Sequence, residues 1–484
     1  MTSRRTRLLV LTAVGALTLA ACGGDDSADS TDAPSTDAPT TDAPTTDAPT
    51  TDAPTTDAPT TDAPTTDAPT TDAPTTDAPA EGWAVNTDDC VDPDAANEPI
   101  EGTVKIGSAM PLSGGAAAAA FAPVASGFEA YIDYANENGL LEGYTIEIDI
   151  QDDQYSKDLT PGVVESLLDS GVHMFSGIIG SPNNAAVRDL LNEECYPQLM
   201  ALTGSPQWGE VADYPWTTGA LIPYPTEVQG YLAQLATEFP DGGTMGLFTV
   251  NNEFGQFYVD ALKEHAGDFG WEIVDEQTIE AAETAPPTAQ VNSIASKAPD
   301  VVMAVPLGAQ CATFLSEVQN AKAANAGWNP PVYLTSTCAS QLILQLAGPA
   351  ATGLITSASA GINDIDNPEV VASNPDYQAY ADYMTSTGRA EMVTTGAAGW
   401  TVAEVTVEIL RQAAASEAGL TRASIINAAR NFTYEPTLVR DGVVYSMNGE
   451  EDPFIVEAIQ VVQFDATSST FTDIGELVLD FESS

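Results

Sequence analysis

The stretch Val104-Lys105-Ile106-Gly107, with the loop Pro111-Leu112-Ser113-Gly114-Gly115 close behind it, begins a series of strand, loop and helix units. Its apolar residues predict a strand, and the apolar pattern of residues 121–138 predicts the helix that follows. Residues 145–150 alternate between apolar and polar side chains and predict a second strand. Strands that alternate with helices are typical of a parallel, doubly wound α/β sheet.

The pattern continues along the chain and then restarts. A helix follows Pro161, residues 174–179 predict a buried strand, and Ser181-Pro182 opens a helix with Ser181 as N-cap and Pro182 as first residue. After Pro223-Tyr224-Pro225 the series begins again, with predicted strands at 245–250, 272–278, 301–305, 332–335 and 354–358, a helical pattern over 374–430, and strand-like segments at 457–464 and 471–479. About 380 residues exceed what one hydrophobic core serves, so we expect two α/β lobes.

The charge of the chain limits the classes of partner. The net charge is −56, and three of the 14 basic residues, Arg4, Arg5 and Arg7, lie at the N-terminus, which leaves 11 for the rest. Such a field disfavours nucleic acid, anionic lipid surfaces and polyphosphate ligands. Solubility or adaptation to salt explains the acidic surface without a function, and we favour that interpretation.

The N-terminal segment carries a targeting signal. An apolar run over residues 8–21 follows the three arginines and ends in Leu19-Ala20-Ala21-Cys22, which resembles the lipobox of bacterial lipoproteins. The resemblance implies a signal peptide over residues 1–21, cleavage before Cys22 and acylation of its thiol. The run of about 14 residues is too short to span a bilayer comfortably. We expect a protein held by lipid at the outer face of a membrane; an ordinary secretory signal is the alternative.

A repetitive segment follows the predicted anchor. Ten copies of Asp-Ala-Pro run from Asp32-Ala33-Pro34 to Asp77-Ala78-Pro79, mostly separated by two threonines. The repeat has no residue that could build a core, and proline at every fifth position blocks helix and sheet ladders. We therefore expect residues 22–100 to form a disordered, extended tether, with O-glycosylation left open.

Four cysteines remain besides Cys22, and an even count in an exported chain indicates two disulfides. Cys311 and Cys338 each follow one of two consecutive strands, which places both at the same end of a sheet. Cys90 precedes the first strand, and Cys195 precedes the fourth, which residues 199–202 predict, so both lie near the opposite edge of the first sheet. We predict the pairs Cys311–Cys338 and Cys90–Cys195, against the alternative of four free thiols. A structural zinc site is not expected, because the spacings are unsuitable and only two histidines exist.

Short motifs from residue 101 to about 480 resemble a known family. The resemblance is to type I periplasmic binding proteins, the branched-chain amino-acid receptor group of ABC importers. The motifs that carry it keep the family's order: 104–107 with 111–114, Asp152-Asp153, Ile179-Gly180-Ser181, 201–205, 252–255, 299–302, and 396–404 with Trp400.

The resemblance implies two Rossmann-like lobes joined by three crossovers. We place the crossovers near Ile222, Ala360 and Tyr445. The first lobe then comprises residues 101–222 and 360–444, and the second comprises 223–359 and 445–484. A ligand is expected between the lobes, at the carboxyl ends of the strands.

Hydroxyl residues in the first lobe are the first candidates for ligand contact. Ser113, Ser181 and the run Thr203-Gly204-Ser205 each follow a predicted strand and precede or open a helix. Hydroxyls and free N–H groups at helix N-termini favour an anionic group such as a carboxylate. Ser181 serves equally well as a plain helix cap, whereas Gly204 permits close backbone approach.

The remaining candidates come from family positions. Phe121, Phe254 and Trp400 match positions where the family often places aromatic side chains against the ligand; burial in the core is the alternative. Amino-acid receptors of the family carry an acidic residue after the strand that here ends at Thr335. This chain has Ser336-Thr337-Cys338 instead, with Thr337 taken as a ligand contact. Four acidic residues are candidates to replace the missing one: Asp153, Glu253, Asp364 and Asp366.

These features predict a binding protein rather than an enzyme. No catalytic motif, metal-ligand cluster or cofactor signature stands out. We expect an extracytoplasmic lipoprotein that captures a small amino acid, amide or other carboxylate and delivers it to an ABC permease and ATPase complex. The alternative is a ligand sensor that signals to a membrane or cell-envelope partner.

Overall fold

The computed structural model describes residues 82–358, 361–362, 364–365 and 367–479. Cys22, the predicted signal peptide and the Asp-Ala-Pro repeats lie outside the described residues, as do Ala360 and Asp366. The lipid anchor and the repetitive tether therefore stay predictions.

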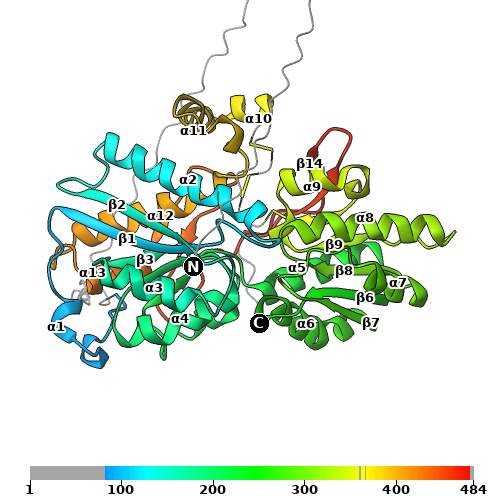
Figure 1. Cartoon of the computed structure of the whole chain (residues 1–484), viewed down its shortest axis with the longest axis horizontal. Helices are drawn as coiled ribbons and strands as arrows, with labels where there is room; N and C mark the ends of the chain where they lie inside the picture. The colour runs from blue at the N-terminus through cyan, green and yellow to red at the C-terminus, as the bar shows by residue number, and fades with distance from the viewer. Residues whose placement is uncertain (1–81, 359–360, 363, 366, 480–484) are drawn as a thin grey trace, which may run out of the picture. The chain divides into compact units, whose positions relative to one another are not determined.

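Five parallel strands form the first sheet, in the order β2-β1-β3-β4-β5. The strands are β1 (Thr103–Met110), β2 (Thr145–Asp152), β3 (Met174–Ser176), β4 (Gln198–Ala201) and β5 (Thr217–Gly219). The helices around them are α2 (Ala118–Glu137), α3 (Thr160–Asp169), α4 (Ser181–Glu193), α12 (Ala397–Ala414) and α13 (Arg422–Arg430). Helices α2 and α12 cover one face, and α3 and α4 cover the other (Figure 1). Two covered faces explain why β3 and β4 are buried throughout.

Seven strands form the second sheet, in the order β14-β13-β10-β9-β8-β6-β7. They are β6 (Gly243–Val250), β7 (Trp271–Ile279), β8 (Val301–Val305), β9 (Val332–Leu334), β10 (Ile355–Ser357), β13 (Val461–Asp465) and β14 (Thr470–Asp473). The last two pair antiparallel and the others parallel. One face packs on α5 (Tyr224–Glu238) and α6 (Glu253–His265), the other on α7 (Thr288–Lys297), α8 (Ala309–Ala324) and α9 (Gln341–Ala347). The predicted two-lobed α/β fold is confirmed.

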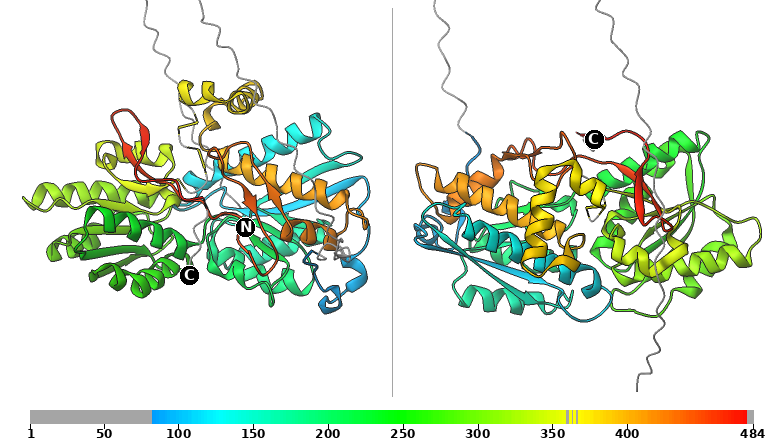
Figure 2. Two further views of the ribbon diagram at one scale, coloured as in Figure 1. Left: turned by 180° about the vertical axis from the view of Figure 1, so that it is seen from behind. Right: turned by 90° about the horizontal axis from the view of Figure 1, so that it is seen from above.

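The chain passes between the two sheets three times. The first passage joins β5 to α5 and contains Ile222. The second follows β10 and leads through α10 (Pro368–Ser373) and α11 (Pro375–Ser386) to α12. The third lies between β12 (Tyr445–Ser446), which pairs with β11 (Thr433–Tyr434) in a small separate sheet, and β13. Figure 2 shows this last part of the chain reaching the edge of the second sheet. The lobe bounds drawn from the sequence stay predictions.

Short helices of three or four residues occupy several of the connections between these strands and helices. They are η1 (Thr87–Asp89), α1 (Pro93–Ala96), η2 (Pro206–Gly209), η3 (Ala266–Phe269), η4 (Ser336–Cys338), η5 (Gly348–Ala351) and η6 (Ala390–Met392).

Residues 82–100 form a strap on the first lobe rather than part of a disordered tether. The Trp83 N–H donates to Asn431 Oδ1 over 2.8 Å, and the Val91 N–H donates to the carbonyl of Glu193 over 3.0 Å. A disulfide from Cys90 also fixes the strap to the first lobe. The prediction of disorder is wrong for these residues, because specific bonds to α4 and α13 compensate the entropy of ordering them.

Both predicted disulfides are confirmed. Cys90 pairs with Cys195 just after α4, and Cys311 in the first turn of α8 pairs with Cys338 in η4. The Cα atoms lie 5.6 and 6.0 Å apart, within the usual range. The second bridge fixes η4, the short turn that follows β9.

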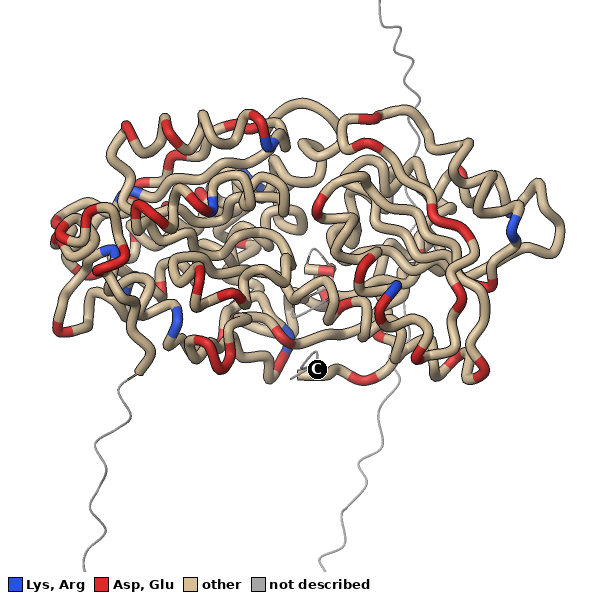
Figure 3. Tube along the Cα trace, turned by 90° about the horizontal axis from the view of Figure 1, so that it is seen from below, with Lys and Arg blue, Asp and Glu red and all other residues tan. Residues whose placement is uncertain are grey.

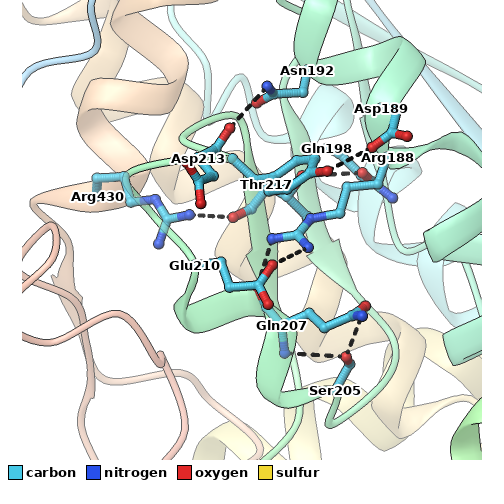
Figure 4. Close-up of polar contacts among 11 residues, drawn as sticks. Arg188, Asp189, Asn192, Gln198, Ser205, Gln207, Glu210, Asp213, Thr217 and Arg430 are labelled. Atoms are coloured by element: carbon cyan, nitrogen blue, oxygen red, sulfur yellow. Dashed lines mark hydrogen bonds and ion pairs between the residues drawn. The ribbon is translucent and has the colours of Figure 1, made fainter.

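Two buried arginines hold the loop that precedes the first passage (Figure 4). Arg188 forms an ion pair with Glu210 over 2.8 Å and lies 3.6 Å from the centroid of the Tyr214 ring. Arg430 is fully buried and donates to the carbonyl of Thr217 at β5 and, over 3.5 Å, to that of Pro453 in the third passage. Burial, and then the charge of Arg188, lower the pKa of Arg430 to about 10, so it stays protonated at neutral pH. Arg430 thus ties β5 of the first lobe to the third passage.

Acidic residues are spread over both lobes, whereas basic residues are few (Figure 3). Within the described ranges, no helix has the length and apolar character needed to cross a membrane. The same residues include no cluster of three or more His, Cys, Asp or Glu suited to hold a metal ion.

Candidate functional site

A cavity of about 340 Å³ lies between the two sheets and is lined from both lobes. The first lobe contributes Phe121 from α2, Tyr155 from the loop after β2, and the face of α12 that carries Thr401. The second lobe contributes Phe254 at the start of α6 and Thr337 in η4. Residues of all three passages also line the cavity, namely Leu221, Ala358 and Val456. Movement of one lobe against the other would therefore change the cavity directly.

The lining is mostly apolar, with hydroxyl groups on both sides. The serine and threonine hydroxyls come from Thr394, Thr395 and Thr401 in the first lobe and from Ser336, Thr337, Ser340 and Ser357 in the second. Among the described lining residues none is Lys, Arg or His, and the one carboxylate is Asp364. The cavity can hold an apolar body with a few polar groups, but it offers no cation to neutralise an anion.

Two aromatic pairs face the cavity from opposite lobes. Phe121 stacks on Tyr155 in the first lobe with ring centroids 6.3 Å apart, and Phe254 packs on Tyr224 in the second at 5.1 Å. Phe121 and Phe254 thus lie where the sequence places them. The two tyrosines were not predicted, although Tyr155 closely follows the Asp152-Asp153 motif. Burial raises the pKa of Tyr224 to about 12, so its hydroxyl stays protonated.

The predicted hydroxyls at the ends of the first-lobe strands do not line the cavity. Ser113 donates to Asp152, and Ser205 accepts the N–H of Gln207 over 3.3 Å at the start of η2. Ser181 and Thr203 are buried against each other, with 2.6 Å between their hydroxyl oxygens. These side chains are already paired within the protein, Ser113 and Ser181 with residues that follow or end a neighbouring strand.

Ser181 is also not the N-cap of its helix. Helix α4 begins at Ser181 itself, Gly180 is the capping residue with φ 101°, and no side chain caps the helix. Only glycine adopts that backbone angle without strain, so the prediction of a serine cap is wrong. Gly180 lines the cavity and brings the N-terminus of α4 close to it.

Gly204 makes a close approach, but to the protein rather than to the cavity. A Cβ at this position would overlap the carbonyl oxygen of Ile222 and the ring of Tyr224. The glycine therefore lets the loop after β4 pack on the first passage. Gly204 is not among the lining residues.

Trp400 lies behind the cavity wall in an aromatic cluster. Its ring centroid is 4.9 Å from those of Tyr131 and Tyr380, and 4% of the residue is exposed. Its neighbours Ala397, Ala398, Thr401 and Val402 line the cavity instead. Consecutive residues of a helix point about 100° apart, so the position next to Thr401 turns away from the face that the cavity uses.

The acidic residues predicted to replace the family's missing carboxylate lie in different parts of the structure. Asp153 is buried and accepts from Tyr155 N–H, Thr160 and Asn183, and burial raises its pKa. Glu253 pairs with Lys157, and Asp364 lines the cavity, where it accepts from Gln341 Nε2. Asp366 lies outside the described residues. Of the described three, only Asp364 lines the cavity.

The two lobes touch beside the cavity. The Ala309 N–H of the second lobe donates to the carbonyl of Ala116 over 2.9 Å, and Lys157 and Glu253 form an ion pair across the lobes over 3.1 Å. Gly308 has φ 52°, and a Cβ there would overlap the carbonyl oxygen of Ala116. The described arrangement is therefore a closed one, with glycine required at one point of contact.

A two-lobed α/β architecture with a cavity between the lobes defines a class of ligand-binding proteins. Residues 103–468 match the family model described as periplasmic binding protein, so the chain belongs to that family, as the sequence motifs predict. No curated protein matches the sequence.

Solved structures share the fold at low sequence identity. One is a branched-chain amino-acid ABC transporter protein from Thermus thermophilus with bound valine, at 18% identity and TM-score 0.68, covering 78% of this chain and 97% of that one. Another is a fatty acid ABC transporter substrate-binding protein from Thermomonospora curvata, at 18% identity and TM-score 0.65. The match covers 79% of this chain and 95% of that one. A third is the solute-binding protein of an ABC transporter from Rhodopseudomonas palustris BisB5, in complex with 3,4-dihydroxybenzoic acid. It has 18% identity and TM-score 0.63, and the match covers 78% of this chain and 98% of that one.

Proposed function

We propose that this chain is the substrate-binding protein of an ABC importer, which captures a small organic ligand between its lobes. The observation that carries the proposal is the cavity of about 340 Å³ lined from both lobes and from all three passages. A ligand that contacts both walls stabilises the closed arrangement, which a permease can distinguish from the open one.

The lining favours a ligand with an apolar or aromatic body and few polar groups. Phe121, Phe254 and the alanines of α12 supply apolar surface, and hydroxyls on both walls supply hydrogen bonds. An amino acid, an amide or a small carboxylate fits this description. Of the solved structures with this fold, one has bound valine, one is the substrate-binding protein of a fatty acid ABC transporter, and one has bound 3,4-dihydroxybenzoic acid. Each of these compounds combines an apolar or aromatic body with a carboxylate.

The direct test is a thermal-shift screen of amino acids, amides, aromatic acids and polyamines, followed by calorimetry of each compound that raises Tm. Ala398→Trp fills the cavity from α12 and is expected to abolish binding, because the new ring occupies the ligand volume. Ala323→Trp, on the exposed surface of α8, is the matched control. Binding that survives Ala398→Trp would place the ligand elsewhere.

We further propose that lipid at Cys22 holds the protein at the outer face of the membrane, within reach of the permease and ATPase. The sequence motif Leu19-Ala20-Ala21-Cys22 supports the anchor. The repeats that follow supply a spacer between the membrane and the binding domain.

A further inference from the structure

Glu227 is a carboxylate buried directly behind the second-lobe wall of the cavity. It lies in the first turn of α5 and is fully buried. Its oxygens accept from Tyr258, and they lie 3.0 Å from the hydroxyl of Tyr231, whose single proton is shared with the Leu334 carbonyl at 2.9 Å. Burial first, and the charge of Glu227 second, raise the pKa of both tyrosines well above the ordinary value, so both hydroxyls keep their protons as donors.

Two further donors to Glu227 belong to the cavity wall. The Ser336 N–H donates over 3.0 Å and the Ser357 hydroxyl over 2.5 Å, and both residues line the cavity. Among the described residues, no Lys, Arg or His forms an ion pair with this carboxylate. The buried carboxylate of Glu227 is therefore stabilised by neutral donors alone, and two of these donors belong to residues that line the cavity.

This arrangement fixes what the wall can offer. A serine hydroxyl has one proton, and that of Ser357 is directed at Glu227, so only the lone pairs of its Oγ remain for a ligand. The Ser336 N–H is likewise directed at Glu227 rather than at a ligand. In a low-dielectric site the charge of Glu227, which no cation neutralises among the described residues, adds a negative potential at this wall.

We propose that Glu227 is a positioning residue that sets the polarity of the second-lobe wall, so that the wall selects ligands with an N–H or O–H donor directed at Ser357. The proposal rests on the function proposed above and narrows its ligand class. Glu227 does not touch the ligand; it acts through the orientation of Ser357 and through its charge.

The test compares matched compounds that differ only in their N–H or O–H donor groups. The pairs are L-valine with 3-methylbutanoate, L-phenylalanine with 3-phenylpropanoate, and 3,4-dihydroxybenzoate with benzoate. We expect the wild-type protein to bind the donor-bearing member of at least one pair about tenfold or more tightly than its partner. Glu227→Gln, which is isosteric but replaces an acceptor with a donor, is expected to bring that ratio close to one.

Two variants separate polarity from stability. Glu404→Gln is the matched control, since Glu404 is also buried and accepts from Tyr434 and Thr437, neither of which lines the cavity. It is expected to lose stability but to keep the wild-type ratio. Ser357→Ala removes the acceptor and is expected to lose the ratio, even if Glu227→Gln fails to fold.

The outcomes are distinct. Ratios that stay at the wild-type value in both Glu227→Gln and Ser357→Ala, or a wild type that binds but does not prefer the donor-bearing compounds, would overturn the inference and leave the binding function intact. Failure of the wild type to bind any of the six compounds would overturn it together with the ligand class proposed above.

Discussion

His173 makes the stability of the first lobe depend on pH. Its Nδ1 accepts the Lys105 N–H over 2.9 Å, which requires an unprotonated nitrogen. Burial, and then the charges of Arg422 and Lys105, lower the pKa of His173. The unfolded chain therefore takes up this proton more readily than the folded protein does. The contribution to stability is complete above about pH 6.5 and is lost as the pH falls through the interval below it.

We expect the free energy of unfolding of the wild type to fall more between pH 7 and pH 5 than that of His173→Gln, whose side chain does not titrate. Chemical denaturation at several pH values measures this difference, and the acidic residues common to both proteins cancel in the comparison. Parallel pH profiles for the two proteins would refute the role assigned to His173.

At the scale of single residues, the sequence predicts some of the cavity and not the rest. Phe121, Phe254 and Thr337, which the family resemblance indicates as candidates for ligand contact, do line it. Trp400 does not, since a shift of one residue on a helix turns a side chain by about 100°. No sequence signal distinguishes Glu227 from an acidic residue that merely favours a helix N-terminus, because its partners at the cavity wall, Ser336 and Ser357, lie 109 and 130 residues away in the sequence.

At the scale of elements, the connection from β8 to α8 carries a requirement for glycine. Gly308→Ala would place a Cβ against the carbonyl of Ala116 on the other lobe, at a φ that disfavours alanine. The substitution therefore opposes closure more than it opposes folding of either lobe. We expect ligand affinity to fall by about tenfold or more, since the apparent affinity scales with the closed fraction.

Calorimetry with a ligand identified by the screen checks this expectation. Gly327→Ala is the matched control, because Gly327 also has a positive φ, of 99°, but has open space around its Cβ position. Equal losses of affinity in the two variants would show that backbone strain, and not contact between the lobes, is responsible.

The elements themselves are largely predictable, and the exceptions have identifiable causes. Alternating strands and helices mark both sheets, since each βα unit carries its own apolar period. The predicted Cys90–Cys195 bridge ties residue 90 to the first lobe. The other bonds that hold residues 82–100 were not predictable, because they come from α4 and the end of α13, far along the chain. The antiparallel pairing of β13 and β14 likewise depends on tertiary contact rather than on local pattern.

At the scale of the whole molecule, the anchor decides where the protein works. Cys22→Ala removes the thiol that would carry lipid, and the repeats after it contain no apolar segment that could replace it. We expect the variant to appear in the soluble fraction of cells or in the medium, whereas the wild type sediments with membranes. A variant that still sediments with membranes when permease is absent would contradict the lipoprotein assignment.

The central claim is that a ligand bound in the cavity holds two lobes closed. Small-angle X-ray scattering of the binding domain, with and without a saturating ligand from the screen, tests it most directly. We expect the radius of gyration to fall on binding and the bound profile to match the arrangement in which Ala309 contacts Ala116. A radius of gyration that stays the same at saturation would contradict the account.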